Sequence, residues 1–157
     1  MTDGSAGESP PESYFERLSV GETRTTQGRT ITGADVANFA GVSGDFNELH
    51  TNHEAMAESQ FGERIAHGAL VFSVMTGLLW QSRSPDEREA LVAFYGVDRL
   101  RFVAPVLVGE TIHVELDVLE KERRDHPEAT GLVRYESRVV DQDDEVVCSC
   151  ELLTLVR

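Results

Sequence analysis

Hydrophobic residues recur with a helical period in the first half of the chain. After Thr32, the apolar residues that fall on one face of a predicted helix are Val36, Phe39 and Ala40. Thr32 suits the N-cap of this helix, and Asp35 can return a hydrogen bond to the backbone amide of Thr32. Further on, residues 68–80 carry no charge, which predicts a helix that is buried on most sides.

The second half of the chain has the pattern of strands. Four runs rich in Val, Leu, Phe, Tyr and Thr predict strands at residues 91–105, 110–120, 130–140 and 145–156. Residues 21–32 are rich in threonine and predict an edge strand or a strand with a bulge at Gly28, whereas the polar residues 82–89 predict a loop or a short exposed turn. Early helices, late strands and one apolar helix between them indicate an α+β fold, in which an antiparallel sheet curls around that helix.

Chain length and composition indicate one folded unit. Residues 1–13 are rich in Gly, Ser, Glu and Pro, so we expect a disordered acidic tail there. The remaining residues 14–157 are enough for a single domain with a substantial core. Within that domain, Asn52 is expected to cap a second short helix at residues 53–59.

The chain is strongly acidic and poor in lysine. It contains 14 Lys and Arg against 28 Asp and Glu, which gives a formal net charge of -14, and Lys121 is its one lysine. A nucleic-acid partner is not expected, because phosphate binding needs a cationic surface. An acidic, lysine-poor surface suits a high-salt cytoplasm, where counterions screen self-repulsion; stability that failed to rise in molar KCl would count against this hypothesis.

The sequence gives no signal for export or for a membrane span. Residues 1–13 lack the basic start and the apolar core of a signal peptide. The longest apolar segment, residues 66–81, is too short to span a bilayer. Cys148 and Cys150 alternate along one predicted strand, where a bridge would be strained, so we expect buried free thiols in a reducing compartment. The expectation is a cytoplasmic protein without a membrane partner.

Candidate chemistry lies just after the first predicted helix. Asp45, Asn47 and His50 place a carboxylate, an amide and an imidazole within six residues. On an unbroken helix, Asp45 and His50 would lie roughly 140° apart and could not act on one substrate atom. Gly41 and Gly44 allow the helix to stop first, because glycine reaches the left-handed conformations that helix ends use. We therefore expect an overhanging loop that carries the three side chains.

Two plainer interpretations of this stretch stay open at this point. Asp45 and Asn47 can be turn-forming residues that bond to nearby backbone, with His50 an ordinary capping or surface histidine. Alternatively, His50 and His53 could bind a metal together with Asp45, but two histidines three residues apart are a weak signal and no resident metal is expected.

Two motifs change the balance between these interpretations. Ser-Gly-Asp-Phe-Asn-Glu-Leu-His occupies residues 43–50, and Arg-Ile-Ala-His-Gly-Ala-Leu follows at residues 64–70. In this order they resemble the hydratase signature of the MaoC-like family, which includes the (R)-specific enoyl-CoA hydratases, and the resemblance extends from about Tyr14 to the C-terminus. It implies a hot-dog fold, a homodimer or a higher homo-oligomer, and reversible addition of water to a trans-2-enoyl thioester of coenzyme A.

The same resemblance implies roles for individual residues. Asp45 would act as the base and His50 as the proton donor, while Asn47 would position this pair or the water. The amide of Gly68 would polarise the thioester carbonyl at the start of the apolar helix, where unpaired N–H groups carry partial positive charge. The residues expected to bind substrate are Ala66, His67 and Ser73.

For other residues that could contact the substrate, the sequence indicates the role less clearly. His67 is expected to orient the turn before the apolar helix, and Ser73 either to bond to a loop residue or to be a tolerated core serine. Coenzyme A enters as part of the substrate, and no separate cofactor is expected. The candidates for contacts to its phosphates are Arg64, Arg99 and Arg101.

The sequence departs from the family pattern at three positions. Glu48 stands where proline is usual, Asn52 where aspartate is frequent, and Ala69 where a larger residue is common. A Glu48 carboxylate that faced Asp45 would repel it and change the pH profile, whereas one that faced solvent would not.

Two other functions on the same fold are alternatives. A thioesterase would use a carboxylate to direct water at the carbonyl carbon, and release of free thiol would reveal it. A non-enzymatic acyl-CoA-binding module would keep the groove and Gly68 but would have no use for an acid–base pair. The joint presence of Asp45, Asn47 and His50 favours an enzyme.

Overall fold

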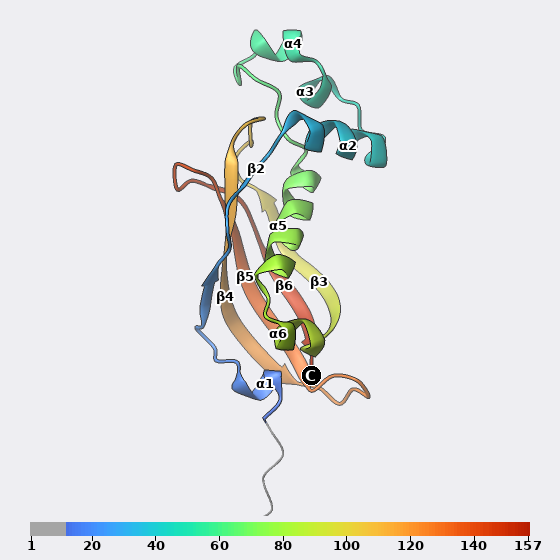
Figure 1. The fold of residues 1–157 in the computed structure, drawn as a ribbon, viewed down its shortest axis with the longest axis vertical. Helices are drawn as coiled ribbons and strands as arrows, with labels where there is room; N and C mark the ends of the chain where they lie inside the picture. The colour runs from blue at the N-terminus through green and yellow to red at the C-terminus, as the bar shows by residue number, and fades with distance from the viewer. Residues whose placement is uncertain (1–11) are drawn as a thin grey trace, which may run out of the picture.

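One antiparallel sheet forms the frame of the protein, for which a computed structural model describes residues 12–157. The tail predicted at residues 1–13 lies outside the described residues except for its last two. The strands follow the order β1-β4-β5-β6-β3, with β2 also paired to β4, and Figure 1 shows the sheet curved around one long helix, α5 (Gly68–Ser82). The strands are β1 (Thr23–Thr25), β2 (Arg29–Thr30), β3 (Leu91–Phe102), β4 (Thr111–Arg123), β5 (Gly131–Val140) and β6 (Val146–Val156).

The core lies between α5 and the concave face of this sheet. The residues that α5 buries are Leu70, Val71, Val74, Met75, Leu78 and Leu79. From the sheet, Val114, Val133 and Val139 are fully buried within the same cluster. Burial of apolar surface on this scale is the main stabilising contribution to folding. The predicted α+β fold, with an antiparallel sheet around a buried apolar helix, is confirmed.

Two local predictions differ from the structure. The sequence predicts a loop or a short exposed turn at residues 82–89, but a six-residue helix, α6 (Pro85–Ala90), begins after Ser84, whose side chain forms a capping box with Glu87. The helix is too short to show a hydrophobic period, so its signal was the cap and Pro85 rather than the pattern. Residues 21–32 contain two short strands, β1 and β2, both paired with β4, instead of one bulged strand.

The two cysteines lie on β6 and are free and buried. Burial raises the pKa of the Cys148 thiol to about 11 and that of Cys150 to about 12. Both thiols therefore stay protonated at neutral pH, and a protonated thiol is a poor nucleophile. The prediction of buried free thiols is confirmed.

The short helices gather at the two ends of the sheet. Residues 33–67, which we call the overhang, extend past one end and contain α2 (Gly33–Ser43), α3 (Glu48–Thr51) and α4 (His53–Ala57) (Figure 1). The predicted capping box of Thr32 and Asp35 begins α2, and Asn52 caps α4. The helix α1 (Tyr14–Arg17) and α6 lie at the opposite end of the sheet. None of the helices in the described residues is long and apolar enough to cross a membrane.

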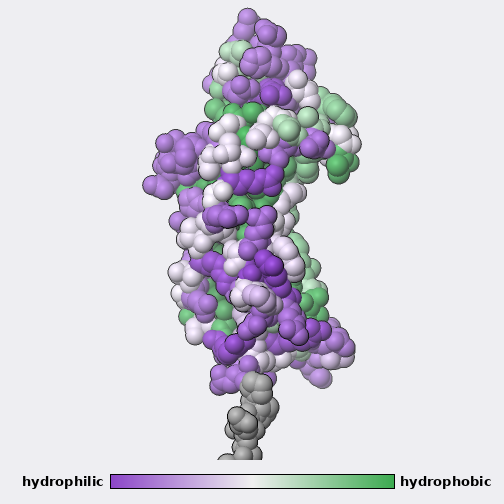
Figure 2. Space-filling view, in the orientation of Figure 1, coloured by the Kyte–Doolittle hydropathy of each residue, from purple (hydrophilic) through white to green (hydrophobic). Residues whose placement is uncertain are grey.

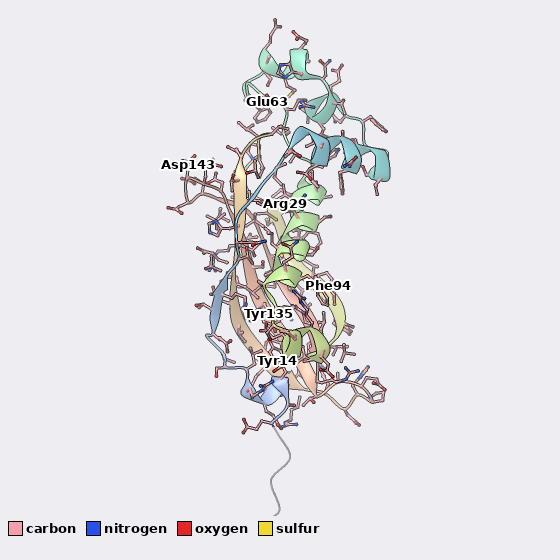
Figure 3. All side chains as sticks on the ribbon, in the orientation of Figure 1. Tyr14, Arg29, Glu63, Phe94, Tyr135 and Asp143 are labelled. Carbon is pink, nitrogen blue, oxygen red and sulfur yellow. The ribbon has the colours of Figure 1, made fainter. Side chains whose placement is uncertain are left out.

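At the end opposite the overhang, polar side chains connect α6 to β1. Glu87 of α6 accepts hydrogen bonds from Arg24 of β1 and, at 2.7 Å, from the backbone N–H of Ser84. Burial by itself raises the pKa of Glu87, but these hydrogen bonds outweigh it and hold the pKa below the ordinary value. Tyr14 and Tyr135 lie close together there (Figure 3), and burial raises the pKa of both phenols.

Candidate active site

The end of α2 delivers the first candidate residue. Gly44 closes the helix with φ +78°, and its N–H donates to the carbonyl of Ala40 at 2.8 Å. A left-handed residue at this position is a common helix stop, and glycine adopts it without strain. The chain therefore leaves the helix axis directly before Asp45, as the sequence predicts, and the Asp45 side chain is 55% exposed.

Asn47 shapes the turn that follows. Its N–H donates to Asp45 Oδ1 at 3.2 Å, and its own Oδ1 accepts from the N–H of Leu49 at 3.0 Å. Asn47 thereby caps the one-turn helix α3, which carries His50. The turn-forming interpretation is thus correct for the local contacts of Asp45 and Asn47, and these contacts set the direction in which His50 points.

His50 is buried and its hydrogen bonding defines its tautomer. The residue is 8% exposed, and its Nδ1 lies 2.7 Å from the carbonyl oxygen of Ile65. A carbonyl can only accept, so Nδ1 carries the hydrogen and Nε2 is left for chemistry. Nε2 lies 4.0 Å from Asp45 Oδ2, which is too long for a direct hydrogen bond and leaves room for one molecule to contact both atoms.

His67 lies against His50. The two rings stack with centroids 3.7 Å apart and an interplanar angle of 26°, and Phe39 packs on His67 at 5.0 Å. His67 Nε2 donates to the backbone carbonyl of Asp45 at 2.9 Å. His67 is 3% exposed, and its Nδ1 is buried without a hydrogen-bond partner in the described part of the protein.

The start of α5 differs from the start of every other described helix. Side chains cap the N-termini of α1, α2, α3, α4 and α6, whereas the N-cap residue of α5, His67, makes no capping hydrogen bond. The first N–H groups of α5, beginning with Gly68, are therefore left for a ligand. A Cβ on Gly68 would lie 2.8 Å from the ring of Phe102, so glycine is needed where that ring closes over the helix end.

An open cleft of about 300 Å³ joins these elements. Its walls include His50 and Gly68, so the imidazole and the free helix end face one space. The remaining lining is apolar and comes from α5, the segment before it, the end of β3, the chain after β3 and the start of β6: Ile65, Ala66, Val71, Phe102, Val103, Ala104, Pro105, Val106 and Val147. Such a cleft, apolar with a few convergent polar groups, is typical of a small-molecule site.

Comparison with known proteins identifies the family. A family model described as MaoC like domain matches residues 16–140. The chain belongs to the MaoC-like family. It is 40% identical over 112 residues to protein MaoC of Klebsiella aerogenes, a match that covers 71% of this chain and 32% of that protein. This chain thus spans about a third of the length of that relative.

Other relatives match over more of their length. The (R)-specific enoyl-CoA hydratase of Aeromonas caviae is 34% identical over 119 residues, which covers 76% of this chain and 84% of that protein. A solved structure of the monoamine oxidase regulatory protein from Archaeoglobus fulgidus superimposes with a TM-score of 0.82 at 35% identity, covering 92% of this chain and 94% of that one. The fold is the hot-dog fold that the resemblance implies: a Mycobacterium tuberculosis protein described as having a double hot-dog fold superimposes with a TM-score of 0.77 at 21% identity, covering 91% of this chain and 43% of that one.

Of the three residues predicted to bind substrate, one lines the cleft, one is buried and one is exposed on α5. Ala66 lines the cleft, and its N–H donates to the carbonyl of Val106 at 2.7 Å. His67 is buried behind His50, as described above. Ser73 does not bond to a loop residue: it is exposed, and its hydroxyl donates within the helix to the carbonyl of Ala69 at 2.8 Å. A serine hydroxyl one turn from a helix carbonyl satisfies itself locally, so Ser73 is not brought to the cluster around His50.

The arginines predicted to reach the phosphates of coenzyme A are engaged in different ways. Arg64 lies 3.5 Å from the carboxylate of its neighbour Glu63, and Arg99 pairs with Glu151 on β6. Arg101 donates to the carbonyl of Leu100 at 2.7 Å. Arg99 shares the Glu151 carboxylate with Arg134 and its side chain is exposed, and the three contacts to phosphate stay predictions.

Glu48 and His53 lie away from the candidate pair in this MaoC-like protein. The Glu48 carboxylate accepts from the Asn52 side chain at 3.2 Å, so it is held along α3. His53 contacts Glu63, labelled in Figure 3, at 3.5 Å and is exposed, so it does not join Asp45 and His50. The residue that does approach them is His67: the three side chains offer ligand atoms within 4.8 Å of one another. The two imidazole rings stack, however, so their in-plane lone pairs lie in nearly parallel planes and converge poorly on one ion.

Sequence reasoning did not find the role of Phe102 or the partner of His67. Phe102 closes over Gly68, but at the end of a predicted strand it had the pattern of any apolar strand residue. The stacking of His67 on His50 joins positions 17 residues apart, and no local pattern encodes that pairing. The Ala-His-Gly triplet marked the position of His67 without revealing its partner.

Proposed function

We propose that this chain is an (R)-specific enoyl-CoA hydratase, or 3-hydroxyacyl-CoA dehydratase in the reverse direction, that adds water to a trans-2-enoyl-CoA thioester. One observation carries the proposal: the uncapped N-terminus of α5 at Gly68 opens into the same cleft as His50, which faces Asp45. Free N–H donors at a helix end, next to an acid–base pair, suit a reaction in which negative charge develops on an oxygen while protons are transferred. The R stereochemistry rests on the likeness to the hydratase of Aeromonas caviae.

The helix end accounts for activation of the substrate. In a conjugated thioester, the β-carbon accepts a nucleophile only if charge on the carbonyl oxygen is stabilised. The Gly68 N–H, at the positive end of the α5 dipole, would donate to that oxygen as the charge develops. The loss of one such donor typically lowers a rate by about 100- to 1000-fold.

The acid–base pair accounts for the protons. Asp45 would take one proton from the water as the new bond forms between the water oxygen and the β-carbon. His50, in its doubly protonated form, would give the Nε2 proton to the α-carbon as the carbonyl forms again, while its Nδ1–H stays bonded to Ile65. A new water that enters the 4.0 Å space and bonds to both side chains would then relay a proton from Asp45 to His50, which resets the pair. The overall step consumes one water and no cofactor.

We propose that a second copy of the chain pairs with the sheet at its edge strand β3. Among the described strands, β3 lies at the end of the sheet order and pairs with β6 alone. Three of its exposed side chains are aromatic, with Phe94 50%, Tyr95 66% and Phe102 54% exposed, whereas Asp98, Arg99 and Arg101 are charged. An edge strand with exposed aromatic side chains can pair with another strand, and Phe102 also lines the cleft, so a homodimer at this edge would help to close the site. Light scattering that found a monomer at micromolar concentration would contradict this proposal.

The experiment follows the absorbance of crotonyl-CoA near its enoyl band, at low salt and in molar KCl. Asp45→Asn keeps the acceptor for the Asn47 amide but removes the base, and His50→Asn keeps a donor toward Ile65 but removes the ring. We expect at least about a 100-fold loss of kcat in each variant. Glu48→Gln is the matched control, since its carboxylate is held along α3, and it should keep the wild-type rate.

Two results would contradict the hydratase proposal. If the wild-type protein left the absorbance of crotonyl-CoA and of longer and branched enoyl thioesters unchanged, but released free thiol, the protein would be a thioesterase. If it bound acyl-CoA without either reaction, it would be a binding module. Thiol release is therefore measured in parallel on the same samples.

A further inference from the structure

Two histidine rings connect the loop and helix that carry Asp45 and His50 to the segment that leads into α5, in opposite directions. His50, on α3, donates to the carbonyl of Ile65, two residues before His67. His67, directly before α5, donates to the carbonyl of Asp45, five residues before His50. The rings themselves stack with centroids 3.7 Å apart. Each ring thus holds the backbone of the segment that carries the other ring.

We propose that His67 is a positioning residue that fixes the base Asp45 relative to the oxyanion donor Gly68, an inference that rests on the proposed hydratase function. His67 precedes Gly68 in the chain, and its Nε2–H reaches the Asp45 carbonyl at 2.9 Å. One residue therefore connects the two halves of the site. In the reaction these halves must act on atoms of the same thioester, so an error in their separation lowers the rate directly.

Asp45 needs this support because its other hydrogen bonds are local. Its N–H donates to the hydroxyl of Ser43 and its carboxylate accepts from the N–H of Asn47, each at 3.2 Å and each two residues away. Within the described part of the chain, the bond from His67 is the one hydrogen bond that ties Asp45 to a distant segment. All nine residues from 41 to 49 are exposed, so apolar packing gives the loop little support.

The ring of His67 is well suited to serve as such a tie. It is 3% exposed and packs against His50 and Phe39. Because the Asp45 carbonyl can only accept, Nε2 carries the hydrogen, and the buried Nδ1 has no hydrogen-bond partner among the described residues. A donor fixed by packing holds its acceptor more closely than a flexible side chain would.

Two substitutions separate the hydrogen bond from the ring. His67→Gln places an amide N–H near the position of Nε2 but removes the aromatic stack, and His67→Phe keeps an aromatic ring but removes the donor. If the hydrogen bond positions Asp45, His67→Phe should lower kcat for crotonyl-CoA by about 10- to 100-fold with KM changed less than about threefold. His67→Gln should recover most of that loss. If His67→Phe does not fold, His67→Ala replaces it in the comparison.

A second readout does not depend on activity. Backbone hydrogen exchange, measured by mass spectrometry on peptides that cover residues 44–50, should be faster in His67→Phe than in the wild-type protein and close to wild type in His67→Gln. Equal loss of kcat in both variants, or exchange that is unchanged in His67→Phe, would overturn the inference. An inactive wild-type protein would refute the proposed function instead, and the exchange result would still decide whether His67 holds Asp45.

Discussion

The sheet with α5 and the overhang are stabilised in different ways. In the sheet, β4, β5 and β6 pair along most of their length, with one register shift in each pair, and packed apolar side chains fill the space against α5. In the overhang, few residues are buried, and two of them are histidines: Val36, Ala40, His50, Met56, Ala66 and His67. Figure 2 shows hydrophobic side chains over the end of α2, where Val42 is 86% and Phe46 65% exposed.

The difference teaches which changes each region tolerates. A packed core responds to volume, because neighbouring side chains have no room to move. The overhang has room, and it depends instead on caps, on single hydrogen bonds and on two left-handed glycines, Gly44 and Gly62. Substitutions in the sheet should therefore change stability, and substitutions in the overhang or at the start of α5 should change activity first.

The largest effect on stability is expected at Gly131, the first residue of β5. A Cβ there would lie 2.3 Å from the ring of Phe15 and 2.6 Å from the carbonyl oxygen of Glu122. Gly131→Ala should lower the free energy of unfolding by about 3 kcal/mol, because a backbone atom and a buried ring must both shift. Urea unfolding measures it, with Gly96→Ala on β3 as the control, whose Cβ would meet Leu153 at an ordinary 3.4 Å. Equal stability of both variants would show that α1 is not packed against the sheet as described.

Gly68→Ala should show the opposite balance between stability and activity. The new Cβ would push the exposed ring of Phe102 into the cleft, so we expect hydratase activity to fall by at least about tenfold while stability changes by less than about 1 kcal/mol. Gly77→Ala is the control on the same helix, because nothing lies within 4 Å of its Cβ. It should keep full activity and stabilise the protein by up to about 1 kcal/mol. Loss of activity in both variants would place the sensitivity in α5 as a whole.

At the end of α2, two exposed glycines allow a finer test. Gly44 has φ +78° and Gly41 lies within the helix, and a Cβ on either would meet no atom within 4 Å. Gly44→Ala should therefore destabilise the protein by about 1 kcal/mol through backbone strain alone and slow the reaction, because Asp45 follows it directly. Gly41→Ala should stabilise α2 by about 0.5–1 kcal/mol. Thermal unfolding and the crotonyl-CoA assay measure both effects, and similar Tm values would contradict the role given to the left-handed turn.

Patterns in the sequence were sufficient for most of the sheet region. The four long strands begin and end within about three residues of their predicted bounds, because alternation and turn residues are local signals. The uncharged run of residues 68–80 indicated α5 for the same reason. The helix α6 was missed, since a helix of six residues depends on its cap and on Glu87, whose partner Arg24 is 63 residues away.

The candidate site was predictable only in its local part. The stop at Gly44 and the capping role of Asn47 follow from residue type and spacing, and the structure shows both. The contacts that complete the site at the start of α5 are long-range: Phe102 of β3 lies over Gly68, and His67 contacts His50 and Asp45. Such contacts depend on how the fold brings the end of β3 and the loop around Asp45 to the start of α5, and no period in the sequence encodes that arrangement.

The smallest effect concerns pH and lies at the end opposite the overhang. The pKa of Glu87 is held below its ordinary value, since the hydrogen bonds from Arg24 and Ser84 outweigh the effect of burial. The ionised Glu87 therefore stabilises the fold above the pKa of the unfolded chain, near 4.3, and this contribution is lost as pH falls through the lower folded value. Glu87→Gln, which still suits the capping box, should be less stable than the wild-type protein by up to about 1 kcal/mol at pH 7 and by a clearly smaller amount at pH 3. Urea unfolding at both pH values checks this against Glu89→Gln, an exposed carboxylate on the same helix. A deficit as large at pH 3 as at pH 7 would mean that packing of Glu87, rather than its charge, holds α6 to β1.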